Sequence, residues 1–184
     1  KYKDFLDYCE RLIGKPIYDF DKDPDKPFIS ADQFKKIVSL LKSKKNIILE
    51  GTPGVGKTFL ARKIAYQLIG ELKDENIEMV QFHQSYSYED FVQGIRPSEE
   101  GGFERRNGIF FDFCCKARRS PDQQFVFIID EINRGNISKI LGELMMLIEA
   151  DKRKKQYAIK LTYSNEDDER FFVPENVYLI GCMN

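Results

Sequence analysis

One octapeptide constrains this chain more than any other feature: residues 51–58 read Gly-Thr-Pro-Gly-Val-Gly-Lys-Thr. The spacing G-x-x-x-x-G-K-T is that of the phosphate-binding loop of nucleoside triphosphatases. The run before it, residues 46–50, predicts a short buried strand, and apolar residues at helical spacing follow it over residues 60–68. Strand, glycine loop and helix form the context that the motif requires, so a turn without ligand is much the less favoured interpretation.

Each residue type in this loop has a physical role in holding phosphate. Glycines let the backbone bend tightly so that its N–H groups point at phosphate oxygens, and the next helix adds the positive end of its dipole. We expect Lys57 to place a positive charge at the β- and γ-phosphates and Thr58 to offer its hydroxyl to Mg²⁺. The predicted nucleotide-binding residues are Gly51, Thr52, Pro53, Gly54, Val55, Gly56, Lys57, Thr58 and Phe59.

Two carboxylates form a second chemical motif at the end of another apolar run. Residues 125–129, Phe-Val-Phe-Ile-Ile, suit a strand that is buried on both faces of a parallel sheet, and Asp130 and Glu131 follow at once. We expect Asp130 to hold Mg²⁺, directly or through water, and Glu131 to orient and polarise the attacking water as a base. A solvated acidic turn is the alternative, and a phosphate loop upstream disfavours it.

The composition limits the class of protein. The chain has 184 residues, 42% hydrophobic and 32% charged, which suffices for one α/β domain with a substantial core. Its net charge of -1 gives no global field that favours nucleic acid or membrane, and no apolar run is long enough to predict a transmembrane helix. The four cysteines include no Cys-x-x-Cys pair, and the start of the chain lacks a signal-peptide pattern. Both observations favour a cytoplasmic protein without zinc or disulfides.

The remaining segments extend the α/β pattern at both ends. Residues 5–13 predict a first helix, and a charged, proline-interrupted linker follows, so we separate residues 1–27 from a nucleotide-binding core of residues 28–184. Residues 30–33 fit a capping box that opens a second helix. Strands are predicted at residues 77–82 and 177–182. With long helical connections, the four strands are expected to form one parallel sheet with right-handed crossovers.

Between these strands the sequence predicts two inserted hairpins and one strong helix. A helix that begins near Tyr88 is interrupted by turn residues over 96–108 and resumes at residues 109–119, with its phenylalanines in the core. Residues 138–150 predict a continuous amphipathic helix. Residues 156–162 and 170–173 flank a polar stretch and predict the second hairpin.

A basic run and a single histidine have ordinary structural interpretations. Residues 152–155 read Lys-Arg-Lys-Lys and could contact a phosphodiester backbone, but a solvated helix end is favoured, since cations suit that end of the dipole. Backbone binding would need a larger basic face, so we expect DNA specificity to lie outside this chain. His83 has no cysteine or second histidine as a metal partner, and we interpret it as structural.

Four stretches together resemble the AAA+ nucleotide-hydrolysing modules of McrB type, which belong to modification-dependent restriction systems acting at 5-methylcytosine. The stretches are residues 51–58, 80–91, 130–143 and 173–184, and the resemblance runs from about residue 28 to the end. The phosphate loop alone specifies only a very large superfamily, and the other three are far more specific. The resemblance implies a P-loop αβα sandwich with strand order 5-1-4-3-2, hexameric assembly and nucleotide bound at subunit boundaries.

Several residue roles rest on this resemblance. Asn184 matches the polar sensor-1 residue that helps to place the attacking water, so Glu131 and Asn184 are the expected catalytic residues, and Thr58 and Asp130 the expected Mg²⁺ ligands. The two inserts resemble the helix-2 insertion and the pre-sensor-1 hairpin of this branch. Arg134 matches a family arginine whose role stays open, in its own subunit or across a boundary.

The resemblance also implies how much of the machinery these residues hold. Because the family motif continues beyond Met-Asn, we expect a fragment without the fifth strand, the helical lid and the arginines that act across subunits, and with a frayed Asn184. We therefore expect ATP or GTP binding with Mg²⁺ but weak hydrolysis, in a parent that forms a homo-hexamer with a nuclease subunit and DNA. Two alternatives stay open: a MoxR-like, ATP-driven remodeller of proteins, and a nucleotide-gated assembly module with little hydrolysis.

Overall fold

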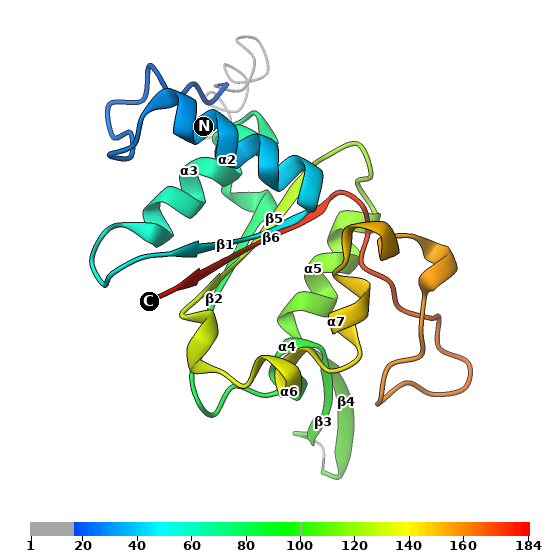
Figure 1. Ribbon diagram of the computed structural model, residues 1–184. Helices are drawn as coiled ribbons and strands as arrows, with labels where there is room; N and C mark the ends of the chain where they lie inside the picture. The colour runs from blue at the N-terminus through cyan, green and yellow to red at the C-terminus, as the bar shows by residue number, and fades with distance from the viewer. Residues whose placement is uncertain (1–16, 100) are drawn as a thin grey trace, which may run out of the picture.

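The computed structural model describes residues 17–99 and 101–184, so the helix predicted at residues 5–13 lies outside the described residues. Its centre is a four-stranded parallel sheet (Figure 1). In order across the sheet, the strands are β1 (Asn46–Glu50), β6 (Val177–Met183), β5 (Phe125–Asp130) and β2 (Ile77–Gln81). The predicted parallel pairing and strand order are confirmed. Strand β1 lies at one edge, where its Ile48 side chain is 59% exposed.

Helices cover both faces of this sheet. In chain order they are α2 (Ala31–Lys44), α3 (Lys57–Ile69), α4 (Tyr88–Phe91), α5 (Ile109–Arg118), α6 (Ile137–Leu141) and α7 (Leu144–Leu147). Single 3-10 turns occur at η1 (Asp74–Asn76), η2 (Ile132–Arg134), η3 (Ala150–Lys152) and η4 (Lys155–Tyr157). Figure 1 shows α2 and α3 on one side of the sheet and α5 and α7 on the other, so the fold is the expected three-layer αβα sandwich.

The alternation of side chains along β5 explains the two layers. Val126 and Ile128 lie in the buried cluster with α2 and α3, whereas Phe125, Phe127 and Ile129 lie in the cluster with α5 to α7. All five side chains are at most 2% exposed. Burying one such side chain is worth about 1.5–3 kcal/mol, so a strand that is apolar on both faces is stable only between two helical layers.

Capping residues set the helix ends where the sequence predicts them. Ser30 forms the expected capping box with Gln33 at the start of α2. At the end of α3, Gly70 adopts φ 83° and its N–H donates to Tyr66 O, which satisfies one carbonyl of the last turn. The segment before α2 also packs against it, because the rings of Phe20 and Phe34 stack 4.3 Å apart.

The first inserted hairpin is confirmed, and it begins earlier than the turn residues suggest. Strands β3 (Gln93–Pro97) and β4 (Phe103–Asn107) pair antiparallel and extend away from the sheet beside α4 (Figure 1). The base of the hairpin is closed by a hydrogen bond from Gly108 N–H to Val92 O, 2.8 Å. A Cβ at position 108 would lie 2.4 Å from the Phe91 backbone, so this close approach requires glycine.

The prediction of one helix over residues 138–150 is wrong. The segment divides into α6 and α7 at Gly142, which has φ 49° and ψ −128°. The next residue, Glu143, uses its carboxylate to accept hydrogen bonds from Tyr88 Oη at 2.7 Å and Thr162 N at 3.1 Å. The backbone leaves the helical region at Gly142, a left-handed φ that glycine adopts without steric cost, and the Glu143 contacts hold the chain after the break.

The second hairpin, predicted over residues 156–173, is also not formed as a ladder. It is reduced to η4 and a single antiparallel bridge between Ile159 and Phe171. Side chains hold the polar stretch instead: Arg105 pairs with Asp168, and Tyr163 Oη donates to a Glu89 carboxylate oxygen at 2.9 Å. Beyond that bridge, these side chains tie the segment to β4 and α4.

The basic run at residues 152–155 is not a uniformly solvated helix end. Arg153 is 1% exposed, and its guanidinium donates to Ile148 O at 2.9 Å, Val177 O at 2.7 Å and Asn46 Oδ1 at 2.5 Å. Burial lowers the pKa of Arg153 to about 10, so the side chain remains protonated at neutral pH. It ties the segment after α7 to the starts of β1 and β6.

The cysteines and helices of the described part of the chain add two observations. Cys114, Cys115 and Cys182 are free thiols. Within residues 17–99 and 101–184, none of the helices combines the length and the apolar composition needed to cross a membrane.

The contacts of Arg153 predict a large stability effect. Arg153→Met keeps most of the side-chain volume but removes the donors to Val177 O and Asn46 Oδ1. We expect the free energy of unfolding to fall by about 2–4 kcal/mol, because buried acceptors are left unpaired. The exposed neighbour provides the control, since Lys154→Met should change it by less than about 0.5 kcal/mol. Equilibrium unfolding in urea measures both, and equal midpoints for the two variants would contradict the assignment.

Candidate active site

The phosphate loop connects the end of β1 to the start of α3 along an exposed path. Gly54 and Gly56 both have φ 81°, a left-handed conformation that glycine adopts without steric cost. Gly56 is the N-cap of α3, and no side chain caps the helix there. The free N–H groups of the first turn and the positive end of the dipole therefore face the loop, which is the arrangement that binds phosphate.

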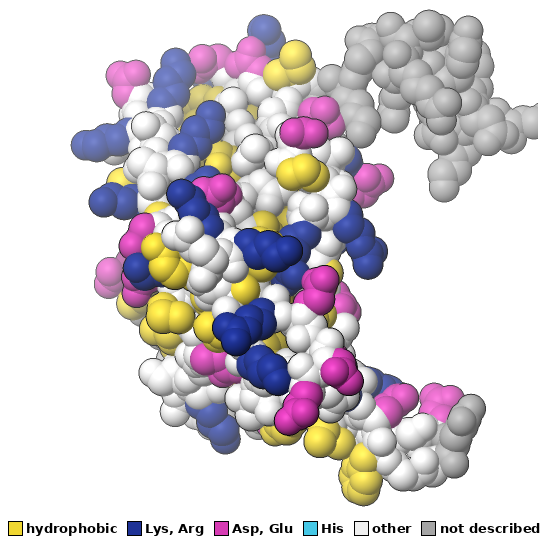
Figure 2. Space-filling view, turned by 90° about the vertical axis from the view of Figure 1, so that its right-hand side faces the viewer, with side chains coloured by type: hydrophobic (Ala, Val, Ile, Leu, Met, Phe, Trp, Pro, Cys, Tyr) yellow, Lys and Arg dark blue, Asp and Glu magenta, His cyan; other side chains and the backbone are white. Residues whose placement is uncertain are grey.

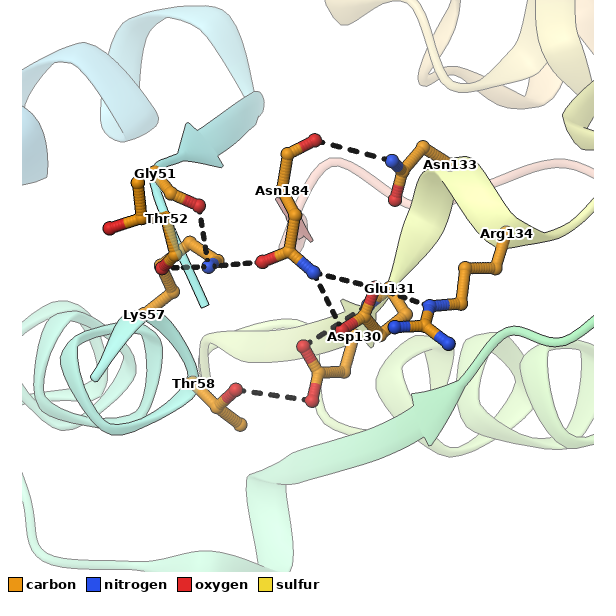
Figure 3. A network of polar contacts seen from close by, with 9 residues as sticks. All are labelled: Gly51, Thr52, Lys57, Thr58, Asp130, Glu131, Asn133, Arg134 and Asn184. Carbon is orange, nitrogen blue, oxygen red and sulfur yellow. Dashed lines mark hydrogen bonds and ion pairs between the residues drawn. The ribbon is translucent and has the colours of Figure 1, made fainter. Parts of the chain in front are cut away.

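Lys57 crosses from the loop to the end of the central strand β6. Its Nζ donates three hydrogen bonds, shown in Figure 3. The acceptors are Gly51 O at 2.8 Å, Thr52 O at 2.9 Å and Asn184 Oδ1 at 2.6 Å. The ammonium group is thus held over the phosphate loop and beside Asn184, which follows β6.

Thr58 and Asp130 place two oxygen ligands side by side. Thr58 Oγ1 donates to Asp130 Oδ2 at 3.1 Å, across the gap between α3 and the end of β5 (Figure 3). Mg²⁺ prefers oxygen ligands and is usually held by one or two protein oxygens together with substrate phosphates and water. A hydroxyl and a carboxylate at this separation fit that requirement.

Glu131 turns sharply out of β5 into the site. Its φ of 51° is left-handed, although it is not glycine, and its N–H donates to Asp130 Oδ1 at 3.1 Å. A non-glycine residue in this region costs of order 1–3 kcal/mol and persists only where its surroundings fix it. The turn directs the carboxylate towards β6 instead of continuing the strand.

The Glu131 carboxylate is held from two sides. Arg134 Nε donates to Oε2 at 2.8 Å, and Asn184 Nδ2 lies 3.0 Å from Oε1 and 3.1 Å from Oε2 (Figure 3). The hydrogen bond from Arg134, then that from Asn184 and the charge of Lys57, hold the pKa of Glu131 below its usual range. The carboxylate is therefore ionised at neutral pH.

The structure brings Lys57, Thr58, Asp130, Glu131 and Asn184 into one network at the carboxyl edge of the sheet. The sequence predicts a frayed Asn184, and this is wrong: its side chain bridges the Lys57 ammonium and the Glu131 carboxylate.

Two other predicted loop residues have exposed side chains. Val55 and Phe59 are 61% and 43% exposed, and the Phe59 ring lies 5.0 Å from Lys63 Nζ. Asn133, which donates to Asn184 O at 3.3 Å, was not predicted. The pairing of Arg134 with Glu131 follows their i, i+3 spacing, which is the sequence signal that could have revealed it.

This fold and site are those of a P-loop nucleoside triphosphatase, and comparison with known proteins agrees. Residues 46–184 match the family described as AAA domain (dynein-related subfamily), and the chain belongs to this family. Within it, the chain is an AAA+ module of McrB type. It is 57% identical over 157 residues to the type IV methyl-directed restriction enzyme EcoKMcrB subunit of Escherichia coli (strain K12), covering 85% of this chain and 34% of that protein.

Two further relatives are more distant. The type II restriction enzyme BsuMI component YdiS of Bacillus subtilis (strain 168) is 25% identical over 178 residues, covering 76% of this chain and 50% of that protein. The chaperone ClpB of Mycoplasma pneumoniae (strain ATCC 29342 / M129 / Subtype 1) is 27% identical over 136 residues, covering 72% of this chain and 18% of that protein. The chain thus spans about a third of the McrB subunit and no more than half of any of the three.

The pairing of Glu131 with Arg134 predicts how the Glu131 carboxyl responds to loss of the arginine. Arg134→Ala should raise the pKa of the Glu131 carboxyl towards its usual value, because the hydrogen bond and the positive charge of Arg134, which stabilise the ionised carboxylate, are lost. A carboxyl group whose pKa is lowered by folding stabilises the folded state at pH values above its usual pKa. This stabilisation is lost as the pH falls through the lowered pKa. The NMR chemical shift of the Glu131 carboxyl carbon, recorded against pH, measures this pKa in the variant and in the unmutated protein. The control is Arg119→Ala on an exposed arginine after α5, and an equal shift in both variants would refute the local pairing.

Proposed function

We propose that this chain binds a nucleoside triphosphate with Mg²⁺ at residues 51–58 and forms the hydrolysing core of a modification-dependent DNA restriction system. The convergence of Lys57, Thr58, Asp130, Glu131 and Asn184 at one sheet edge carries the proposal. The printed name of the E. coli relative, a methyl-directed restriction enzyme subunit, supports the choice of system. The domain would comprise residues 28–184.

Binding follows from charge and from the backbone. The N–H groups after Gly56 would donate to phosphate oxygens, and Lys57 would exchange its loop acceptors for the β- and γ-phosphates. Thr58 and Asp130 would hold Mg²⁺, which neutralises charge on the same phosphates. Nothing in these contacts reads the base, so ATP and GTP are both proposed as substrates.

Hydrolysis needs a water molecule in line with the γ-phosphorus. Asn184 would orient this water, and Glu131 would accept its proton as the new P–O bond forms and the bond to the β-phosphate oxygen breaks. The products are a nucleoside diphosphate and inorganic phosphate. Lys57 would stabilise the negative charge that moves to the leaving oxygen.

The wider assembly is proposed by analogy with the McrB relative. A homo-hexamer with nucleotide at its subunit boundaries, acting in the cytoplasm with a nuclease subunit on DNA, would use the triphosphatase as its motor. An arginine finger is typically worth about 10³–10⁵ in rate, and among the described residues Arg134 already pairs with Glu131. We therefore propose that these 184 residues bind nucleotide but hydrolyse it slowly on their own.

Two alternative functions differ in what they need from the site. A protein remodeller would use the same chemistry, and the 27% identity to the chaperone ClpB is the observation in its favour. A nucleotide-gated assembly module would need no base. The strained turn that directs Glu131 towards Asn184 is costly for a module that only binds, so the site favours hydrolysis.

Binding is tested by Lys57→Ala. Losing a charged donor to the phosphates should weaken triphosphate affinity by about 10- to 100-fold, since hydrogen bonds to charged groups contribute about 1.5–3 kcal/mol. Titration calorimetry with Mg²⁺ and either ATP or GTP measures the change. Lys36→Ala, on an exposed residue of α2, is the control and should bind like the parent. Equal affinity of Lys57→Ala and the parent would end the proposal.

Catalysis is tested by Glu131→Gln in the full-length parent, assembled with its partners. The variant should retain triphosphate binding and lose turnover by about 10²–10⁴-fold, the usual contribution of a general base. Phosphate release is the readout, alongside the same assay on these 184 residues. Full turnover by Glu131→Gln would remove Glu131 as the base, and equal turnover by the two unmutated chains would show that these residues suffice.

A further inference from the structure

A basic pocket lies at the opposite end of the sheet from the phosphate loop. Its volume is about 550 Å³, and residues directly before β1, β5 and β6 contribute to its wall. Five of the side chains that line it are cationic: Lys45, Arg118, Arg153, Lys154 and Lys155. Among the lining residues, only Glu175 is acidic. The pocket therefore has a strong local excess of positive charge, although the chain as a whole is near neutral.

These cations come from three separate parts of the chain. Lys45 is the C-cap of α2, Arg118 is the last residue of α5, and residues 153–155 follow η3. Only the fold brings them together, which is why the basic run in the sequence looks too small for a phosphate backbone. Figure 2 looks onto the side of the molecule that carries the segment after α7, and Lys and Arg side chains gather near the middle of that face.

Arg118 is the first sign that the pocket is suited to an anion. Its guanidinium lies over two aromatic rings, with Cζ 5.0 Å from the centroid of Phe171 and 4.5 Å from that of Phe172. Its Nε and Nη2 are buried and have no hydrogen-bond partner. These two nitrogens form the edge of the guanidinium that binds two oxygens of a phosphate or carboxylate. A small rotation would present them to such a group without breaking a hydrogen bond.

Lys45 lies at the pocket wall and is hydrogen-bonded there. Its φ of 64° is left-handed, at a helix end where glycine would be free of strain. The Nζ donates to Glu175 O at 2.8 Å and to Tyr178 Oη at 3.0 Å, and lies 4.2 Å from the Tyr178 ring centroid. The printed contacts of the ammonium are thus with a backbone carbonyl, a hydroxyl and a ring, and it lines the same pocket as Arg118 and Arg153.

The charge continues from the pocket to the open surface. Arg153 is buried at its inner side, whereas Lys154 and Lys155 are exposed at its rim. Arg153 contributes charge but no contact, because its donors are already used by Ile148 O, Val177 O and Asn46 Oδ1. A chain of phosphates can contact Arg118 and the two rim lysines together, whereas a compact anion cannot. This arrangement favours a polymeric anion, whose backbone carries one negative charge per nucleotide.

We propose that this pocket binds the phosphodiester backbone of nucleic acid, without reading sequence, at a site separate from the nucleotide loop. Backbone contacts of this kind position a nucleic acid and leave specificity to other contacts. The proposal does not depend on triphosphate hydrolysis, because none of the pocket cations belongs to the network around Lys57.

The test is binding of a labelled 20-nucleotide DNA to this chain, measured by fluorescence anisotropy at several salt concentrations. Lys154→Glu/Lys155→Glu should weaken binding by at least about tenfold at low salt, and should flatten the dependence of affinity on salt, because each lost phosphate contact releases one fewer counterion. Lys35→Glu/Lys36→Glu is the matched control, with the same charge change on exposed residues of α2. Its affinity should fall much less.

Further measurements test which anion the pocket binds and whether the pocket is separate from the nucleotide loop. Triphosphate affinity by calorimetry should be unchanged in Lys154→Glu/Lys155→Glu, and Lys57→Ala should leave DNA affinity unchanged. Absence of DNA binding, an equal loss in both double variants, or loss in Lys57→Ala would each overturn the proposal. Inorganic tripolyphosphate supplies the remaining comparison: if it displaces DNA at an equal phosphate concentration, the pocket recognises free polyphosphate and the assignment to a nucleic-acid backbone is wrong.

Discussion

The position of β6 between β1 and β5 is the constraint on which the candidate active site depends. Gly51 N–H donates to Met183 O at 3.3 Å, and β5 pairs with the other side of β6. The phosphate loop, the acidic pair and Asn184 are far apart in the sequence, and this parallel pairing alone brings their strand ends to one edge. Once there, Lys57 and Glu131 can share Asn184 as a common partner.

The features that were predictable from the sequence are those that local chemistry determines. Glycine spacing sets the loop around Gly54 and Gly56, and a run of five apolar residues before Asp130 requires a strand covered on both faces. Parallel pairing follows because long helical connections exclude antiparallel neighbours, whereas the strand order was implied by the family resemblance. Lys57, Thr58, Asp130 and Glu131 could be named before their geometry was known, because they belong to the glycine loop or directly follow a predicted strand, whereas Asn184 was named from the family resemblance.

The features that were not predictable depend on contacts between distant residues. The helix predicted over residues 138–150 breaks at Gly142, beside a Glu143 carboxylate held by Tyr88 and Thr162, and no helical pattern encodes those distant contacts. Arg153 looks like part of a solvated basic run, but its acceptors lie on β1 and β6. Local pattern describes what a segment favours by itself, and a buried charge or a strained turn is stable only when partners elsewhere compensate for its cost.

Strand β6 also connects the two charged ends of the molecule. Asn184 follows its end at the candidate active site, and Tyr178, near its start, lines the basic pocket. At about 3.3 Å per residue, the strand separates them by roughly 20 Å. This exceeds the Debye length of about 8 Å at physiological ionic strength, so an anion bound at one end changes the field at the other only slightly. Communication between the ends would therefore require movement of β6 or of the helices packed on it, and not charge alone.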